Sequence, residues 1–324
     1  MSMLAIEKDS PTMGPSANRQ VRVAHESVLA IAQTDVAVIE VTGDDRATWL
    51  NGLVTCDVLR CDVQRPSYGL VLQRNGRIMS DAVVVVDEAG ERLLVAVPGS
   101  LLDSLMAHLD HYLVMERAEI RGYREGFSAW ALHGPDAPRV GERIRGPRTF
   151  GGALDRTGLK GAFFIVAEPE TERFRVELEQ RVVESGGLVG DDAGWDALRI
   201  ARGVARFGVD FGDTTYPQEA SLETSAVSFD KGCYLGQEVV CMLERRGHVK
   251  RKLVPIVVDA TPPPPRGTAV FDQEGRTSGE ITGSVLAPEQ GRSVALAMVK
   301  RALAEPGTRL VVVGRPAEVM ARSV

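Results

Sequence analysis

The stretch FDKGCYLGQE, residues 229–238, is the most distinctive sequence in the chain. Gly232 and Gly236 bracket a thiol and an aromatic ring, and glycine permits the positive φ angles and close backbone approach of a tight turn. If residues 236–245 form a helix, Cys233 lies just before its N-terminus and two residues from Lys231, and both positive groups favour a thiolate. The spacing leaves two interpretations of Cys233, a reactive or ligating thiol or a small buried hydrophobe in a tight turn.

Upstream of this stretch, the N-terminal part of the chain alternates short strands with helices. Apolar patterning predicts strands at 36–41, 68–73, 78–86 and 93–97, and helices at 46–54 and 100–113. The Asn-Gly pair at 75–76 predicts a hairpin turn between the second and third strands, because both turn positions need positive φ. Consecutive antiparallel strands with few helices are typical of an α+β fold and not of a doubly wound parallel sheet.

The pattern begins again at residue 118. Strands are expected near 118–122, 129–133 and 163–166, and helices at 171–184 and 195–202. After residue 253, four consecutive prolines (262–265) precede short β-rich runs between Gly and Pro turns, which predicts a small all-β barrel or sandwich. The expected organisation is a disordered tail over 1–22, a core over 23–252 and a C-terminal β-barrel over 253–324. Within the core, one unit comprises about 23–117 with 195–252, and the other comprises 118–194.

Composition excludes several classes of protein. The 324 residues suit two or three domains, and the balance of 38 Lys and Arg against 44 Asp and Glu (net charge −6) disfavours a general nucleic-acid binder. No apolar run approaches the roughly 18 residues of a membrane helix, and residues 1–20 lack the apolar block of a secretory signal. The four cysteines form no C-x-x-C pair, so neither a disulfide scaffold nor a closed zinc site is expected. Reduced thiols and a cytoplasmic location follow as the default.

The motif KGCYLGQE at 231–238 resembles the signature of the YgfZ family of folate-binding proteins, relatives of the glycine-cleavage T-protein that serve in maturation or repair of iron–sulfur enzymes. The similarity extends to LNGLVTCDV at 50–58, NGRIMSD at 75–81, LRI at 198–200 and FGVD at 207–210. The resemblance implies two α+β units of the aminomethyltransferase folate-binding type, a C-terminal barrel and a ligand channel between the units.

Three positions depart from the aminomethyltransferase pattern. Ser80 stands where those enzymes usually carry a second acid after the hairpin, Ala201 replaces the acid of their "LRLE" helix, and Leu159 occupies the place of an acid in their second domain. These losses argue against glycine-cleavage transfer, which needs an acid near the reacting folate nitrogen.

Two candidate site residues also have a basis in the pattern itself. Asp81 lies inside an apolar strand, where a buried unpartnered carboxylate is costly. It either faces a ligand cavity, where it binds or protonates a folate nitrogen, or caps the strand at the surface. Arg199 shares a helix face with Arg202, and its planar fork suits the carboxylates of a folate tail, although a solvated helix face explains it equally well.

The resemblance implies Cys233 and Asp81 as the chemical residues. Its implied cofactor-binding set is Asp81, Arg199, Lys231, Tyr234, Gln237 and Glu238. No resident metal is expected, since one cysteine cannot hold a four-thiolate cluster.

The function expected from the sequence is that of a cytoplasmic YgfZ-type protein. It would bind tetrahydrofolate or a one-carbon derivative and assist assembly or repair of iron–sulfur enzymes, with those enzymes or assembly proteins as partners and no nucleic acid or membrane. Two alternatives stay open. One is a folate-dependent aminomethyl transferase. The other is a non-catalytic interaction module with a relic folate pocket, docking through the basic segment 245–252.

Overall fold

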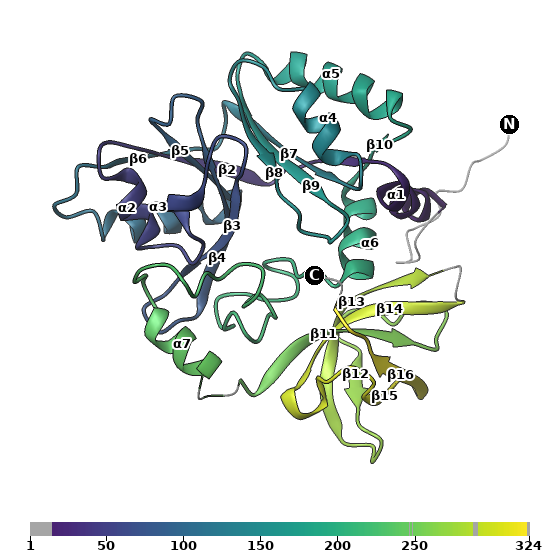
Figure 1. Cartoon of the computed structure of the whole chain (residues 1–324). Helices are drawn as coiled ribbons and strands as arrows, with labels where there is room; N and C mark the ends of the chain where they lie inside the picture. Colours follow the sequence, from purple (N-terminus) through teal and green to yellow (C-terminus); the bar gives the residue numbers. More distant parts are fainter. Residues whose placement is uncertain (1–14, 246, 248, 288–290, 323–324) are drawn as a thin grey trace, which may run out of the picture.

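The structure is a computed structural model that describes residues 15–245, 247, 249–287 and 291–322. Three lobes surround a central connecting segment (Figure 1). The first lobe contains a five-stranded antiparallel sheet of order β3-β4-β5-β2-β6. Its strands are β2 (Val36–Thr42), β3 (Ser67–Leu72), β4 (Ile78–Val86), β5 (Leu93–Pro98) and β6 (Glu119–Tyr123).

Two short helices cover one face of this first sheet. The helices are α2 (Arg46–Asn51) and α3 (Leu102–Asp110). Leu102, Leu105 and Leu109 recur at three- and four-residue spacing on α3 and are buried against the sheet. The opposite face of the sheet points toward the centre of the molecule and carries Leu70, Val83 and Val85.

The second lobe repeats this arrangement with a five-stranded sheet of order β10-β1-β7-β9-β8. Its strands are β1 (Leu29–Ala32), β7 (Phe127–His133), β8 (Thr149–Ala153), β9 (Gly161–Ala167) and β10 (Leu188–Val189), and helices α4 (Ala137–Arg143) and α5 (Thr171–Glu184) pack on its outer face. The inner face contributes Phe150, Phe163 and Ile165 to the same central core as the first sheet. The two sheets therefore share one apolar interior.

The third lobe is a closed six-stranded barrel of order β11-β14-β13-β12-β15-β16, with its own apolar interior. Its strands are β11 (Arg251–Val258), β12 (Ala269–Phe271), β13 (Thr277–Ala287), β14 (Arg292–Lys300), β15 (Arg309–Val312) and β16 (Arg315–Val319). Helix α6 (Asp192–Arg202) lies between the second lobe and this barrel (Figure 1).

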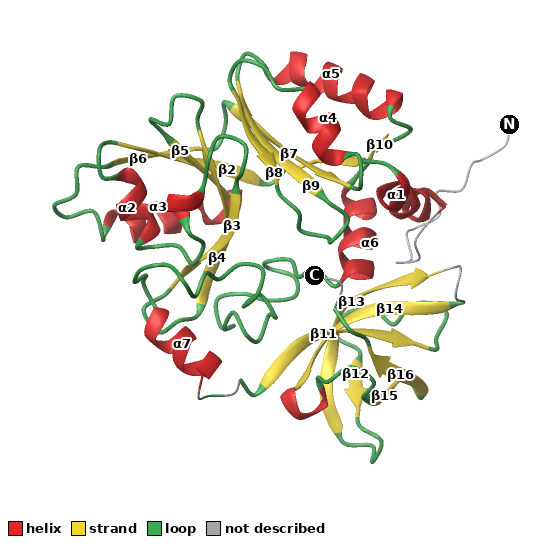
Figure 2. Cartoon of the chain, in the orientation of Figure 1, coloured by secondary structure: helices red, strands yellow, loops and turns green. Residues whose placement is uncertain are grey.

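Residues 203–236 run through the middle of the molecule without a helix or a named strand, as the loops at the centre of Figure 2 show. Backbone hydrogen bonds attach this segment to the first lobe, from Ile78 to Thr215, from Ser228 to Thr55 and from Leu235 to Gly52. Its apolar side chains enter the central core, and they include Ala205, Phe211, Leu222, Val227 and Tyr234. Helix α7 (Gln237–Arg245) then leads toward the barrel.

The α+β class and the C-terminal barrel expected from the sequence are confirmed. The boundaries differ at the N-terminus. Helix α1 (Pro15–Glu26) occupies part of the expected tail, because it packs on α6, whereas residues 1–14 lie outside the described residues. Strand β1 belongs to the second lobe, since it pairs with β7 and β10. Strand β6 completes the first sheet beside β2 and does not begin the second unit.

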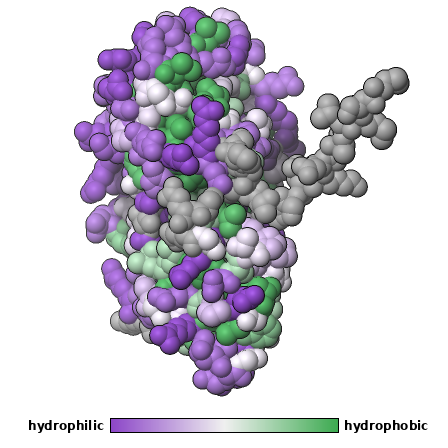
Figure 3. Space-filling view, turned by 90° about the vertical axis from the view of Figure 1, so that its right-hand side faces the viewer, coloured by the Kyte–Doolittle hydropathy of each residue, from purple (hydrophilic) through white to green (hydrophobic). Residues whose placement is uncertain are grey.

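The surface is mostly polar. In the view of Figure 3, hydrophobic residues form scattered patches among hydrophilic ones. Within the described ranges, no helix is both long enough and apolar enough to cross a bilayer.

Candidate functional site

Two adjoining cavities open at the centre of the molecule. The first has a volume of about 280 Å³ and is walled by β3, by the loop around Asp155 and by residues 222–228 of the connecting segment. The second has a volume of about 180 Å³ and lies between the first sheet, Phe163 of β9 and Trp195 of α6. Tyr68, Arg156 and Ala205 line both cavities. Cavities between structural units are preferred places for small ligands.

Asp81 lies in the wall of the second cavity. It is half-buried on β4, and one of its oxygens, Oδ2, accepts a hydrogen bond of 3.1 Å from the hydroxyl of Tyr68. No hydrogen bond to the other oxygen, Oδ1, occurs among the described residues. The carboxylate therefore has an acceptor available to a ligand. Burial raises the pKa of the Tyr68 phenol above its ordinary value, so the hydroxyl keeps its proton and donates to Asp81.

Arg156 crosses the ring of Tyr68. Its guanidinium carbon is 3.8 Å from the ring centroid, within the range of a cation–π contact. Among the described residues the guanidinium has no hydrogen bond and no ion pair, although the neighbouring Asp155 carboxylate accepts three backbone N–H groups of its own loop. Asp81, Tyr68 and Arg156 thus form a row of a carboxylate, a phenol and an unpaired cation.

The apolar part of the cavity wall comes from both sheets and the connecting segment. Val83, Ala96, Phe163 and Phe207 line the second cavity beside the polar row. An apolar wall with a few convergent polar groups is the usual composition of a small-molecule site. A flat heterocycle with hydrogen-bonding edges fits this donor and acceptor set.

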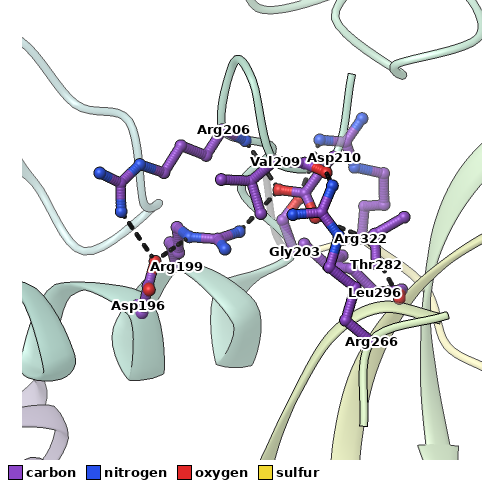
Figure 4. Close-up of polar contacts among 10 residues, drawn as sticks. All are labelled: Asp196, Arg199, Gly203, Arg206, Val209, Asp210, Arg266, Thr282, Leu296 and Arg322. Atoms are coloured by element: carbon purple, nitrogen blue, oxygen red, sulfur yellow. Dashed lines mark hydrogen bonds and ion pairs between the residues drawn. The ribbon is translucent and has the colours of Figure 1, made fainter. Parts of the chain in front are cut away.

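Arg199, which the resemblance places in the ligand set, lies in a network of ion pairs with Asp196 and Asp210 (Figure 4). Its side chain is 2% exposed and pairs with Asp210 at 2.7 Å and with Asp196 at 2.6 Å. It lines neither of the two central cavities. The Asp210 carboxylate also accepts a 2.5 Å hydrogen bond from the Thr282 hydroxyl of β13, so this network attaches α6 to the barrel.

Lys231 is buried beneath the segment that follows α2. Its ammonium donates hydrogen bonds of 2.6, 2.8 and 2.7 Å to the backbone oxygens of Asn51, Val54 and Cys56. Burial lowers the pKa of Lys231 to about 8. The three carbonyl dipoles hold the charged end in place, so the side chain fixes the start of the KGCYLGQE motif against the first lobe. It lines neither central cavity.

Cys233 is exposed on the surface and lies outside both central cavities. Tyr234 beside it is buried, and Leu235 and Gly236 form a turn before α7, so three residues separate the thiol from the helix. Gly236 has a φ of +79°, and a Cβ there would lie 2.8 Å from the Gln73 oxygen. Glycine at this position lets the motif pack on the 73–77 hairpin. The thiol is presented outward between two anchored positions, Lys231 and Gly236.

The remaining motif residues are placed around this turn. Gln237 accepts a hydrogen bond of 3.4 Å from the Tyr234 backbone, and Glu238 is exposed. The Tyr234 ring lies 5.3 Å from the Lys231 ammonium, and its buried hydroxyl has no hydrogen-bond partner among the described residues. The structure therefore brings the motif residues together around the exposed Cys233. Asp81 lies apart from them, in the wall of the second cavity.

Residues 56–57 connect the first central cavity to the motif around Cys233. Cys56 and Asp57 line the first cavity, and the Cys56 oxygen accepts from Lys231, two residues before Cys233. Burial raises the pKa of the Cys56 thiol to about 12, so this thiol stays protonated. All four cysteines are free. Within the described residues, no group of three or more His, Cys, Asp and Glu side chains is arranged to hold a metal ion.

The sequence reasoning did not single out Tyr68 or Arg156. Tyr68 stands in an apolar strand, where an aromatic ring is ordinary core. Arg156 stands in a polar loop, where a cation is usually solvated. The signal that points to them is their proximity to Asp81, which only the folded chain provides.

Comparison with known proteins gives the class of protein first. Residues 7–148 match the GCVT N-terminal domain, and residues 251–324 match the glycine cleavage T-protein C-terminal barrel domain. The chain therefore belongs to the family that is built from these two domains. This confirms the resemblance found from the sequence motifs.

Three kinds of protein are similar to this chain. The chain is 28% identical to a tRNA-modifying protein YgfZ of Sodalis glossinidius, with 82% of this chain and 81% of that protein aligned. It is 26% identical to the mitochondrial iron–sulfur cluster assembly factor IBA57 homologue of Neosartorya fischeri over 80% of this chain, and it spans 64% of that relative's length. The crystal structure of the glycine cleavage system aminomethyltransferase T of Bartonella henselae has the same fold, with a TM-score of 0.79, 19% identity, and coverage of 94% of this chain and 88% of that chain.

Proposed function

We propose that this chain is a tetrahydrofolate-binding protein of the YgfZ type that assists assembly or repair of iron–sulfur enzymes in the cytoplasm. The observation that carries the folate part is the Asp81 carboxylate, which lies in the central cavity with one oxygen unpaired among the described residues. A reduced pterin ring has an edge of N–H donors that this oxygen can accept, and the apolar wall suits the faces of the ring.

The iron–sulfur part of the proposal is supported by the similarity to an iron–sulfur cluster assembly factor and by the exposure of Cys233. An exposed thiol is accessible to a second protein, whereas a thiol inside the cavity would reach only a small ligand. The proposed partners are iron–sulfur enzymes or their assembly proteins, and Cys233 is the proposed point of chemical contact. A resident cluster is not part of the proposal, and stoichiometric iron and sulfide in the purified protein would contradict it.

The test of folate binding is calorimetry with tetrahydrofolate on the wild type and on Asp81→Ala. We expect micromolar binding that the substitution weakens at least tenfold, about 1.4 kcal/mol. Asp103→Ala is the matched control, because that carboxylate is 87% exposed and pairs with Arg124 on the surface. If neither the wild type nor the variant binds, the folate proposal is wrong and the relic-pocket alternative is favoured.

The aminomethyl-transferase alternative has less support. Ser80, which stands at the second acidic position of those enzymes, is fully buried and donates its hydroxyl to the backbone oxygen of Asp81. Only one carboxylate thus reaches the cavity from this strand. Formation of methylene-tetrahydrofolate from an aminomethyl donor would support the alternative, and its absence in the presence of bound folate would support the first proposal.

A further inference from the structure

Among the described residues, Arg156 has no hydrogen-bond or ion-pair partner, and it lines both central cavities. It is half-buried, and its guanidinium lies over the Tyr68 ring at 3.8 Å. A partly desolvated guanidinium that makes no charge-assisted hydrogen bond gives up interactions that arginine normally makes with carboxylates or carbonyls. Its donors are therefore available on the side that faces the cavities.

The other arginines of these cavities are already engaged. Arg206 in the second cavity pairs with Asp196 at 3.2 Å. Arg322 in the first cavity donates to the backbone oxygens of Ser221 and Gly203. Within the described residues, Arg156 is thus the arginine of the two cavities whose donors have no protein acceptor.

The position of Arg156 relative to Asp81 decides which part of the ligand it meets. The Tyr68 hydroxyl donates to Asp81 at 3.1 Å, and the face of the same ring supports Arg156. One phenol ring therefore separates the anion from the cation. Two groups this close contact the same end of an elongated ligand and not its two ends. In a folate, the glutamate tail is held away from the pterin by a rigid aminobenzoyl spacer, so both groups would meet the pterin.

We infer that Arg156 is a specificity-determining residue that donates to the carbonyl oxygen of the ligand's pterin ring, beside the N–H edge that Asp81 accepts. The inference rests on the proposed function and deepens it. The pterin ring carries a carbonyl next to a ring N–H and an amino group, which matches a guanidinium next to a carboxylate. An ordinary flat aromatic ring without this pair of edges would satisfy neither side chain and would be rejected.

The experiment compares two ligands on purified full-length protein. Tetrahydrofolate and 6-methyltetrahydropterin, which lacks the aminobenzoyl-glutamate tail, are titrated by calorimetry into the wild type, Arg156→Met and Arg156→Lys. Arg156→Met keeps a long apolar side chain on the Tyr68 ring, and Arg156→Lys keeps the charge without the planar fork. Arg139→Met is the control, because that arginine is half-exposed and pairs with Asp136 at the surface. Circular dichroism and the melting temperature establish that each variant is folded.

We expect Arg156→Met to weaken both ligands by the same factor, at least tenfold, with Arg156→Lys between it and the wild type and Arg139→Met unchanged. Weaker tetrahydrofolate binding with unchanged tetrahydropterin binding would overturn the inference and place Arg156 at the carboxylate tail. Wild-type binding that neither Arg156 variant alters would overturn it as well, while the proposed function stands. If the wild type binds neither ligand, the proposed function fails and the inference fails with it. If Arg156→Met does not fold, the Arg156→Lys titration decides alone, and equal affinity to wild type overturns the inference.

Discussion

The guanidinium of Arg199 on α6 lies 2.7 Å from the carboxylate of Asp210 in the connecting segment, and both side chains are shielded from solvent. Asp210 also accepts hydrogen bonds from the Arg206 backbone at 2.9 Å and from Thr282 of the barrel. This carboxylate therefore joins α6 and the connecting segment to Thr282 of the barrel, which is 72 residues away in sequence (Figure 4). The pair is part of the framework that holds the barrel against the core.

Removing the Asp210 charge leaves the buried Arg199 guanidinium with the partly exposed Asp196 as its remaining carboxylate partner among the described residues. We expect Asp210→Asn to lower the free energy of unfolding by about 3–5 kcal/mol, as for other buried ion pairs that lose one member. Urea unfolding followed by circular dichroism measures this loss. The control is Arg206→Met, which removes a pair with Asp196 that is about 40% exposed and contributes under about 1 kcal/mol. A loss for Asp210→Asn as small as that of the control would contradict the structural role assigned to the pair.

Lys231 gives a second prediction about stability. Lys231→Met removes the ammonium and leaves the oxygens of Asn51, Val54 and Cys56 without their buried donor. An unsatisfied buried acceptor costs about 1–3 kcal/mol, so we expect a loss of at least about 2 kcal/mol in the free energy of unfolding. Lys250→Met, which changes an exposed lysine, should stay within about 0.5 kcal/mol of wild type. If the two variants are equally stable, the hydrogen bonds from Lys231 to these three backbone oxygens do not hold the motif in place.

Replacing Cys233 should affect function and not stability. Its side chain is exposed, so Cys233→Ala leaves little packing to lose, and we expect a melting temperature within experimental error of wild type. The proposed role predicts that the same variant fails to restore iron–sulfur enzyme activity in cells deficient in the protein, and that Cys233→Ser also fails. Cys241→Ala is the matched control, because it removes a partly exposed thiol from α7 and should restore activity. Full rescue by Cys233→Ala would rule out the chemical role of this thiol.

The sequence predicted the positions of helices and strands better than it predicted which strands pair with each other. The helix over 171–184 and the strand over 78–86 lie where apolar spacing placed them, because each depends on its own periodicity. The pairing of β1 with β7, and of β6 with β2, could not be read from alternation. Strand partners are chosen by contacts between residues far apart in the chain, and a short apolar strand fits either sheet.

In the candidate site, too, the sequence revealed residues that are unusual in their local context but not residues whose role depends on distant contacts. Asp81 stood out because a carboxylate interrupts an apolar strand, and Cys233 stood out within an unusual motif. Lys231 and Arg199 carry charges whose partners are backbone oxygens or distant carboxylates, so the sequence could not distinguish an internal contact from a ligand contact. Arg156 gave no signal at all, since its position depends on stacking against a tyrosine from another lobe.

The buried side chain of His133 leads to a prediction about how the stability of the protein depends on pH. Its ring is buried, stacks on Trp195 at 4.6 Å, and has no hydrogen-bond partner on either nitrogen among the described residues. Burial, with a smaller contribution from the Arg156 charge, lowers the pKa of His133 to about 3 in the folded protein. The unfolded chain takes up this proton near pH 6.5. Between pH 6.5 and 3 the unfolded state binds the extra proton, so stability falls as the pH is lowered through this range.

At pH 4.5 the contribution of His133 to this loss is about 3 kcal/mol relative to pH 7, from roughly two pH units at about 1.4 kcal/mol each. His133→Phe keeps a flat ring against Trp195 and removes the titrating group, so the difference in unfolding free energy between pH 7 and pH 4.5 should shrink by about that amount. His111→Phe, at an exposed position, should leave the difference as it is in wild type. Urea unfolding of the wild type and of both variants at pH 7 and pH 4.5 measures this difference. An unchanged pH dependence in His133→Phe would mean that this histidine accepts its proton without unfolding.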